Sequence, residues 1–194
     1  MTIRQTVDLT PPGYWGQDRS RIRIVHNVLD QSDLAELFRY AKCNDEWSAV
    51  LSQYQWKDRV HRDFTETLAQ QIADTLHRLV KRMVETEYGV ALVSTGSQLN
   101  RWRVGDKQSP HADKQEVDGG PNCCPMYDLS SIFYLNDDYE GGELYFPNQD
   151  FEIKPIANTL VFFPGDVNYL HGVSEVKFGV RYTVSTFWTV VGIQ

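Results

Sequence analysis

Two histidines and one aspartate in the C-terminal half have the types and spacing of a metal site. His111 and Asp113 are two residues apart, so on a β-strand both side chains would point to one face and could bind the same ion. His171 is the natural third ligand, because it follows an apolar run and a turn at residues 159–170. Two imidazoles and one carboxylate that leave coordination positions open suit a mononuclear non-haem Fe(II) centre. The sequence therefore predicts an Fe(II) site.

An arginine ten residues after His171 supplies a second chemical feature. Arg181 opens the run Arg-Tyr-Thr-Val-Ser-Thr-Phe-Trp, whose apolar and hydroxyl residues are typical of a buried strand. A buried guanidinium needs an anionic partner, because an unpaired charge in the protein interior is very unfavourable. The partner can be a carboxylate of the protein or the carboxylate of a ligand held by two parallel hydrogen bonds.

The residues after Gly89 must form the strands that position these groups. Short runs of β-branched and aromatic residues alternate there with turns rich in Gly, Pro, Asn and Asp. The expected strands cover residues 90–104, 126–135, 143–146, 151–153, 159–163 and 181–191. Because no helical pattern interrupts these strands, their spacing is typical of a sandwich, a jelly roll or a barrel.

Two helices are expected before these strands. The first covers about residues 32–43 and follows a short strand at residues 21–26. The second begins with a capping box formed by Asp63 and Glu66, carries a long apolar stripe that includes Leu68, and stops before the glycine at position 89. Helices followed by strands indicate an α+β fold, with the N-terminal helices supporting one face of a sheet.

Length and composition favour a single globular domain. The chain has 194 residues, of which 41% are hydrophobic, which suffices for one buried core but hardly for two. We therefore expect one domain over residues 1–194, with residues 1–89 as mainly helical support and residues 90–194 as the β-structured core.

Charge and cysteine content limit the partners and the compartment. A net charge of −7 disfavours binding to nucleic acid or to an anionic membrane surface. The chain has no long apolar run and no signal-peptide pattern at its start, so a cytoplasmic location is expected. Three cysteines, two of them adjacent, form no disulfide framework. We expect reduced thiols, with Cys123 and Cys124 in ordinary packing roles.

Several short motifs occur in a fixed order around the metal and arginine positions. They are Trp102-x-x-Gly105, Pro110-His-Ala-Asp113, Ile132-Phe-Tyr-Leu-Asn136, Gly141-Gly-Glu-Leu144, Leu160-Val-Phe-Phe-Pro164, His171-Gly-Val173 and Gly179-Val-Arg-Tyr182. With these motifs, residues 99–188 resemble the 2-oxoglutarate and Fe(II) dependent dioxygenases, and within them the prolyl 4-hydroxylase-like branch. The N-terminal half resembles that family only in its general layout.

This resemblance implies a double-stranded β-helix, also called a jelly roll, that holds iron through His111, Asp113 and His171. It implies 2-oxoglutarate and O2 as co-substrates, with the far carboxylate of 2-oxoglutarate bound by Arg181, and ascorbate as an optional addition. The presence of Asp113 also disfavours halogenation, because halogenating relatives carry a small residue in place of this carboxylate.

Two hydroxyl residues are implied near the same carboxylate. Tyr134 matches a tyrosine that donates a hydrogen bond to 2-oxoglutarate in some family members, and Ser185 occupies a position where a hydroxyl can help. Each could instead be a packing residue of its strand. Arg181 itself departs from many collagen-type prolyl hydroxylases, which have lysine at this position, while other branches have arginine.

The resemblance implies an oxidoreductase that hydroxylates an unactivated C–H bond. The leading hypothesis is a prolyl residue in a peptide or protein as the target. The alternative is a free amino acid or another small metabolite, because the chain shows no separate peptide-binding domain. A third hypothesis is a cupin-like metal-binding protein without catalysis, which the complete set of site residues disfavours. The oligomeric state is not indicated.

Two segments could contact the substrate. Residues 114–125 directly follow the metal pair and could form a rim or lid, or merely connect two strands. Residues 44–62, with Trp47, Tyr54 and Trp56, could cover the substrate or pack over the sheet. Three cations could bind an anionic substrate, although exposed cations are usually solvated: Arg101, Arg103 and Lys114.

Overall fold

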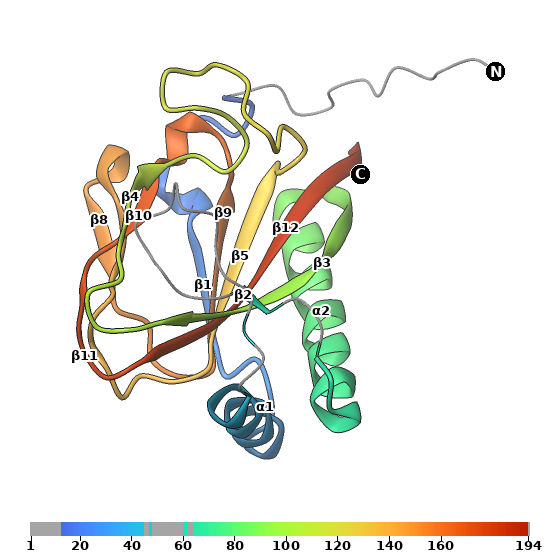
Figure 1. The fold of residues 1–194 in the computed structure, drawn as a ribbon. Helices are drawn as coiled ribbons and strands as arrows, with labels where there is room; N and C mark the ends of the chain where they lie inside the picture. Colours follow the sequence, from blue (N-terminus) through green and yellow to red (C-terminus); the bar gives the residue numbers. More distant parts are fainter. Residues whose placement is uncertain (1–12, 45–46, 48–59, 62–63, 194) are drawn as a thin grey trace.

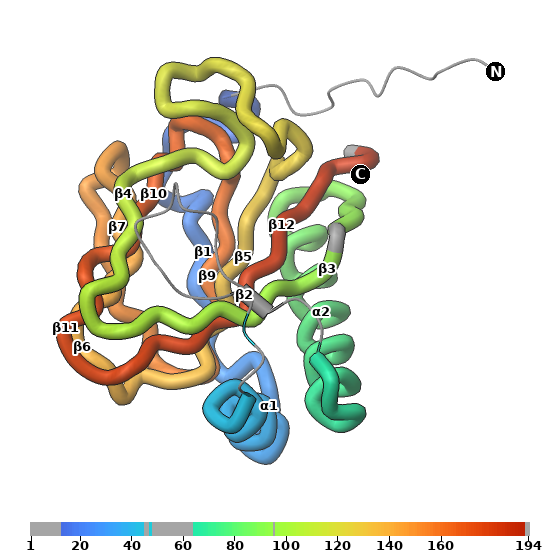
Figure 2. The backbone as a smooth tube through the Cα atoms, viewed as in Figure 1, coloured from blue at the N-terminus to red at the C-terminus, as the bar shows by residue number. Residues whose placement is uncertain are grey.

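The computed structural model describes residues 13–44, 47, 60–61 and 64–193. Two antiparallel β-sheets pack against each other, and two helices cover the outer face of the larger sheet (Figure 1). One short strand precedes the first helix and another lies between the two helices, after which the chain winds back and forth between the sheets (Figure 2). This arrangement confirms the predicted α+β jelly roll with helical support.

The larger sheet has the strand order β1-β9-β5-β12-β3-β2, and the smaller sheet has the order β4-β10-β7-β8. The bounds in the larger sheet are β1 (Arg23–His26), β2 (Val60–His61), β3 (Val90–Trp102), β5 (Leu129–Tyr134), β9 (Thr159–Pro164) and β12 (Arg181–Ile193). Those in the smaller sheet are β4 (Gln108–His111), β7 (Leu144–Phe146), β8 (Phe151–Ile153) and β10 (His171–Val173). A separate pair consists of β6 (Glu140–Gly141) and β11 (Val176–Phe178).

All six strands expected after residue 89 are present, with ends that differ by up to three residues. The strands β4, β6, β10 and β11 are not among the expected ranges. Each of them has only two to four residues, too few for a clear alternation. Single-turn 3₁₀ helices occur at Arg19–Arg21, Pro147–Gln149 and Val167–Tyr169.

The helices are α1 (Gln31–Cys43) and α2 (Thr67–Tyr88). As expected, α2 stops at Gly89, which adopts the left-handed conformation and donates its N–H to the carbonyl of Glu85. Glycine suits this position because it has no Cβ to clash there.

The predicted capping box of α2 is wrong. Glu66 is itself the residue that precedes the helix, and its side chain makes no capping hydrogen bond; Asp63 lies outside the described residues. Leu68 does not belong to the buried stripe, since 53% of its surface is exposed. The apolar pattern predicted the helix correctly, but its N-cap was placed three residues too early.

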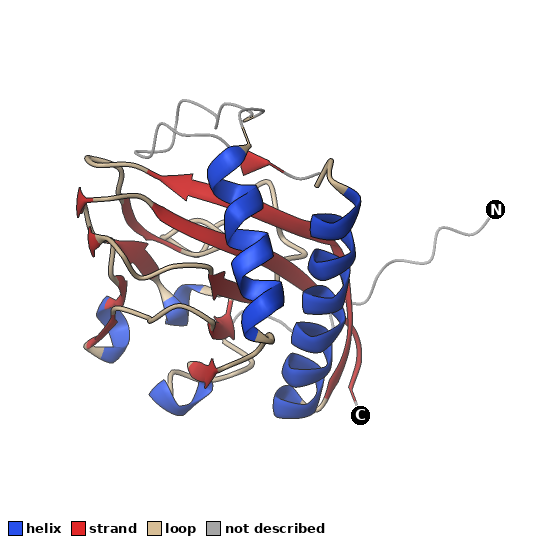
Figure 3. Ribbon diagram, turned by 90° about the horizontal axis from the view of Figure 1, so that it is seen from below, coloured by secondary structure: helices blue, strands red, loops and turns tan. Residues whose placement is uncertain are grey.

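The two helices pack on one face of the larger sheet (Figure 3), where their side chains contact β12. The ring of Trp188 lies 4.9 Å from that of His77 on α2, and the ring of Tyr182 lies 5.9 Å from that of Phe38 on α1. Because side chains alternate along a strand, the odd-numbered residues of β12 point the other way, toward the smaller sheet. Arg181 therefore faces the space between the sheets.

The space between the sheets is lined by aromatic residues. The ring of Phe146 on β7 meets that of Phe163 on β9 at 4.9 Å, edge to face. Phe163 in turn lies 4.5 Å from the ring of His171 on β10. Both phenylalanines are fully buried, so the metal-site histidine on the smaller sheet is packed into the hydrophobic core.

Part of the aromatic segment at residues 44–62 can be placed. Trp47 is buried and its ring lies 6.3 Å from that of Tyr182, which supports the packing interpretation for this residue. Tyr54 and Trp56 lie outside the described residues. Neither described helix combines the length and the apolar character that are needed to cross a lipid bilayer.

Candidate active site

His111, Asp113 and His171 come together in the structure, as the sequence analysis predicts. His111 is the last residue of β4, and His171, the first residue of β10, is its direct partner in the antiparallel ladder. Each histidine Nε2 lies 3.5 Å from a different oxygen of the Asp113 carboxylate. The three ligand atoms all lie within 4.8 Å of one another, which is a suitable arrangement for one metal ion.

The position of Asp113 differs from the expectation in one respect. It does not lie on the same strand as His111, because β4 ends at His111. The chain then leaves the ladder, and the next backbone contact is made by Lys114, whose N–H donates to the carbonyl of Gly165 at 2.9 Å. Asp113 therefore reaches the metal site from a turn, and a strand periodicity does not explain its direction.

Backbone carbonyls orient both imidazoles. His111 Nδ1 lies 3.1 Å from the carbonyl oxygen of Ser109, and His171 Nδ1 lies 3.2 Å from that of Tyr169. A carbonyl can only accept, so each Nδ1 carries the proton and each Nε2 keeps its lone pair. Metal-binding histidines commonly have such a partner on the second nitrogen. Both rings are therefore prepared to bind a metal through Nε2.

Charge at the site favours a cation. Burial alone would raise the pKa of Asp113, but the two imidazoles and the hydroxyl of Ser130 outweigh it and bring the pKa to about 2. Burial lowers the pKa of His171 to about 4. Burial also opposes protonation of His111, but its contact with Asp113 prevails and raises the pKa of His111. At neutral pH the carboxylate is ionised and His171 is neutral.

Arg181 lies deep in the space between the sheets, with 1% of its surface exposed. Its Nη2 donates to the hydroxyl of Tyr134 at 2.9 Å, and its guanidinium carbon lies 5.0 Å and 4.9 Å from the ring centres of Trp102 and Tyr134. No carboxylate within the described part of the chain lies at ion-pairing distance, and Nε has no hydrogen-bond partner there. The described residues thus supply neutral contacts to Arg181 but no counter-charge.

The Gly-Gly motif makes room for this arginine. Gly142 has a φ of +67°, and a Cβ at this position would lie 3.1 Å from Cδ of Arg181. Any larger residue would therefore press on the guanidinium side chain and also strain the backbone.

Ser185 shares the inner face of β12 with Arg181, but its hydroxyl already accepts a hydrogen bond from Nδ2 of Asn100 at 2.9 Å. Between the two, Thr183 is buried and pairs directly with Tyr134 on β5 and with Asn100 on β3. Sequence reasoning missed Asn100 and Thr183. The alternation along β12 would have indicated Thr183, whereas Asn100 follows only from the pairing of β12 with β3.

Two of the three cations considered for substrate binding have structural roles. Lys114 is buried, and its Nζ lies 2.6 Å from Oδ1 of the buried Asp128. The hypothesis that Lys114 binds substrate is therefore wrong. The guanidinium carbon of Arg101 lies 4.4 Å from the ring centre of Trp47. Arg103 is exposed.

The loop after the metal ligands is attached to the site. Asn122 donates from Nδ2 to the carbonyl of Asp113 at 3.0 Å, and its Oδ1 accepts the N–H of Cys124 at 2.8 Å. The sulfurs of Cys123 and Cys124 lie 3.2 Å apart, and Cys123 is exposed. The expectation of ordinary packing is wrong for this pair, because the two side chains face each other at the surface.

Comparison with known proteins adds a family to this geometry. The sequence profile of the 2OG-Fe(II) oxygenase superfamily matches residues 97–189, a segment that contains all three ligands and Arg181. This segment, which holds the whole candidate site, belongs to the 2OG-Fe(II) oxygenase superfamily. Members of this superfamily use Fe(II), 2-oxoglutarate and O2. The match therefore confirms the cofactor and co-substrates that the sequence motifs predicted.

Curated relatives cover different shares of this oxygenase. Prolyl 3-hydroxylase 2 of Homo sapiens is 35% identical in an alignment of length 101 that covers 45% of this chain and 14% of that protein. A PKHD-type hydroxylase of Prochlorococcus marinus is 24% identical in an alignment of length 170 that covers 82% of this chain and 74% of that protein. The oxygenase thus corresponds to only a small part of the prolyl 3-hydroxylases.

Solved structures share the fold of this oxygenase. A prolyl hydroxylase of Trichoplax adhaerens, in complex with a peptide of the hypoxia inducible factor oxygen degradation domain, has a TM-score of 0.70 and 18% identity, covering 88% of this chain and 84% of that one. The viral collagen prolyl hydroxylase of Paramecium Bursaria Chlorella virus-1 has a TM-score of 0.68 and 18% identity, covering 91% and 99%. At this identity, the similarity concerns the fold.

Proposed function

We propose that this oxygenase hydroxylates a prolyl residue in a peptide or protein and binds its two cofactors through the residues described above. The observation that carries the cofactor assignment is the buried guanidinium of Arg181, which has no carboxylate partner among the described residues. A buried cation of this kind is stabilised when a ligand brings the counter-charge. The far carboxylate of 2-oxoglutarate is such a counter-charge, and the hydroxyl of Tyr134 is a second donor for it.

His111, His171 and Asp113 would hold the iron. Their chemistry fits Fe(II), since two imidazoles and one carboxylate leave positions free for the co-substrates. Iron and 2-oxoglutarate, when bound, supply the activation of O2 and the oxidising equivalents for hydroxylation. The protein contributes ionised Asp113, two imidazoles fixed by backbone carbonyls, and an aromatic lining that excludes water.

The open side of the site lies at His111. The side chain of His111 is 28% exposed, whereas those of His171 and Asp113 are 6% and 10% exposed. A substrate therefore approaches the metal from the side of His111 on β4, because the other two ligands and Arg181 are buried. The exposed side leaves room for a residue that remains part of a longer chain, which supports a peptide substrate.

The choice of a prolyl target is supported by the named relatives. Human prolyl 3-hydroxylase 2 is 35% identical over its matched segment, and the solved structures of similar fold include a prolyl-4-hydroxylase of Pseudomonas putida, with a TM-score of 0.67 at 17% identity. These proteins differ in the ring carbon that their names specify. The position of the hydroxyl group is therefore left to the experiment.

The test is a turnover measurement with product identification. Anaerobic protein is loaded with Fe(II) and 2-oxoglutarate, O2 is admitted with proline-containing peptides or with free proline, and succinate and hydroxyproline are quantified. We expect hydroxylated peptide in proportion to succinate, and chromatography of the hydrolysed peptide would identify 3- or 4-hydroxyproline. The Asp113→Ala variant should form neither product.

Two other outcomes would contradict the proposal. If free proline is hydroxylated and no peptide reacts, the substrate is a small metabolite and not a peptide. If the protein binds Fe(II) and 2-oxoglutarate but forms no succinate with any substrate class, the site is a metal-binding one without catalysis.

A further inference from the structure

A β-bulge brings a glutamine to the metal site. His111 pairs with His171, while Gln108 pairs with Val173. Between these two pairs the chain advances three residues on β4 but only two on β10. Residues three apart on a regular strand point to opposite faces, but one extra residue restores the same face. Val173 packs in an interior cluster with Trp102. The bulge thus places the side chain of Gln108 on the inner face of β4, beside His111.

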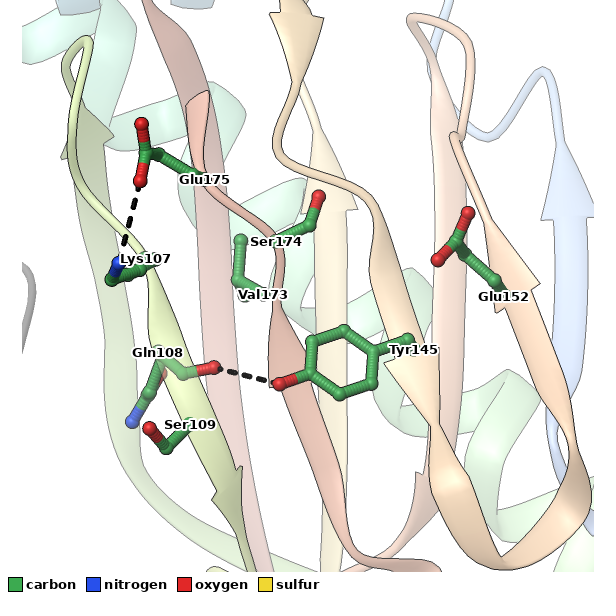
Figure 4. Close-up of a pocket in the computed structure, with 8 residues that line it drawn as sticks. All are labelled: Lys107, Gln108, Ser109, Tyr145, Glu152, Val173, Ser174 and Glu175. Atoms are coloured by element: carbon green, nitrogen blue, oxygen red, sulfur yellow. Dashed lines mark hydrogen bonds and ion pairs between the residues drawn. The ribbon is translucent and has the colours of Figure 1, made fainter. Parts of the chain in front are cut away.

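The backbone carbonyl and the side-chain amide of Gln108 make contacts on different sides of the strand. Its backbone carbonyl accepts a hydrogen bond from the hydroxyl of Tyr145 at 3.4 Å, next to an outer groove lined by Lys107 and Glu175 (Figure 4). Its side-chain nitrogen lies away from Tyr145 in the same view. The contact with Tyr145 fixes the backbone at the bulge and so helps to hold the amide group toward the metal site.

The amide of Gln108 points at the nitrogen that a metal would use. Nε2 of Gln108 lies 3.2 Å from Nε2 of His111. An amide nitrogen can only donate, and His111 carries its proton on Nδ1, which contacts the carbonyl of Ser109. The glutamine therefore donates to the lone pair of His111. Both observations agree on the same histidine tautomer.

Metal binding would break this hydrogen bond. A metal ion on Nε2 of His111 takes the lone pair that Gln108 now contacts, so the two N–H donors of the amide become available next to the open coordination positions. Donors that lose their partner at a partly buried position are expected to take another acceptor. That acceptor must come with the substrate or a water molecule, because His111 marks the exposed side of the site.

We propose that Gln108 is a substrate-positioning residue, which donates a hydrogen bond to a backbone carbonyl of the peptide beside the iron. This inference rests on the proposed function. A prolyl residue has no N–H group, so a protein can recognise its backbone by hydrogen bonds only through carbonyl oxygens, which need donors. The carboxamide of Gln108 supplies two donors at the place where the peptide must pass.

The experiment separates peptide binding from metal binding. The Gln108→Met variant keeps the length of the side chain but removes its donors. Mn(II) affinity of the metal-free protein is measured first, with Mn(II) alone. A fluorescent proline-containing peptide, already shown to be hydroxylated by the unaltered protein, is then titrated against protein loaded with Mn(II) and 2-oxoglutarate without O2. The Lys107→Gln variant, altered on the same segment in the outer groove, is the matched control.

We expect Gln108→Met to weaken peptide binding about tenfold, the effect of losing about one hydrogen bond, with unchanged Mn(II) affinity. Lys107→Gln should match the unaltered protein in both measurements. The Gln108→Glu variant, which keeps the shape and has no N–H donors when ionised, should show the same loss of peptide affinity. Circular dichroism would establish that both Gln108 variants are folded.

An unaltered peptide affinity in both folded variants would overturn the inference. So would a loss of Mn(II) affinity with no effect on the peptide, since the amide would then only support His111. Failure of the proposed function has a different signature, because the unaltered protein would then hydroxylate no peptide, and the role of Gln108 would fall with it.

Discussion

Arg181 on β12 donates a hydrogen bond to the hydroxyl of Tyr134 on the neighbouring strand β5, at 2.9 Å, and both side chains are fully buried. The pair is a cation with a neutral partner, and burial raises the pKa of Tyr134, so the tyrosine stays protonated and does not become a counter-ion. Such a pair is better suited to binding the anionic group of a ligand than to stabilising the ligand-free protein.

The Arg181→Met variant should therefore separate cofactor binding from stability. We expect the affinity for 2-oxoglutarate to fall at least about a hundredfold, because hydrogen bonds to a charged group contribute about 1.5–3 kcal/mol each. The free energy of unfolding without ligands should not fall, since a buried charge without a counter-ion is removed. Calorimetric titration and urea unfolding test the two parts, with Arg101→Met as a control for binding. A large loss of stability with normal binding would contradict this account of the site.

The hydroxyl of Ser130 donates to Oδ2 of Asp113 and should support metal binding. We expect Ser130→Ala to weaken Mn(II) affinity about 10–100-fold, because partners of metal ligands orient them. The neighbouring Ser131 faces the helices, where its hydroxyl accepts a hydrogen bond from Trp188 at 2.9 Å. Ser131→Ala should keep normal Mn(II) affinity while unfolding becomes easier by about 1–3 kcal/mol. Equal Mn(II) affinities in the two variants would argue against the role of Ser130.

The buried pair Lys114 and Asp128 predicts a specific order of stabilities. The Lys114→Met variant leaves the carboxylate of Asp128 buried without its cation, which should lower the free energy of unfolding by about 3–5 kcal/mol. Adding Asp128→Asn removes that charge and keeps an acceptor for the N–H of Val190. The double variant should therefore be more stable than Lys114→Met in urea unfolding. The reverse order would show that Lys114 is not needed as a counter-ion.

His77 should make the fold sensitive to acid. Burial against β3 and β12 lowers its pKa, with Asp74 opposing and Lys81 and Arg78 reinforcing the shift. The unfolded chain therefore binds a proton more readily near the ordinary pKa of about 6.5. The stabilisation is fully present above that pH and is lost as pH falls through the lower pKa of the folded protein.

Urea unfolding at a series of pH values would measure this effect. We expect the difference in stability between the unaltered protein and His77→Gln to shrink as pH falls from about 7.5 to about 5.5, the range around the ordinary histidine pKa. Both proteins should be measured without metal. A constant difference across this range would exclude His77 as the source of acid sensitivity.

The sequence by itself determined the chemistry of the site and the class of the fold. His111, Asp113, His171 and Arg181 could be chosen because their residue types are rare in apolar strands and their partners follow from charge and coordination chemistry. The helices and the longer strands were readable because an apolar face repeats with the period of the element. These features depend on local sequence and on elementary energetics.

Only the tertiary structure decided how the site is completed. Asp113 reaches the metal site from a turn, and a bulge turns Gln108 inward. Lys114 forms a buried ion pair with Asp128. Asn100 becomes part of the inner face through its pairing with Thr183. The places of Gln108 and Asn100 depend on strand register between segments far apart in the sequence, and those of Asp113 and Lys114 depend on how a turn packs against other elements. A shift of one residue turns a side chain to the other face without changing the local pattern, and for that physical reason the sequence alone could not predict them.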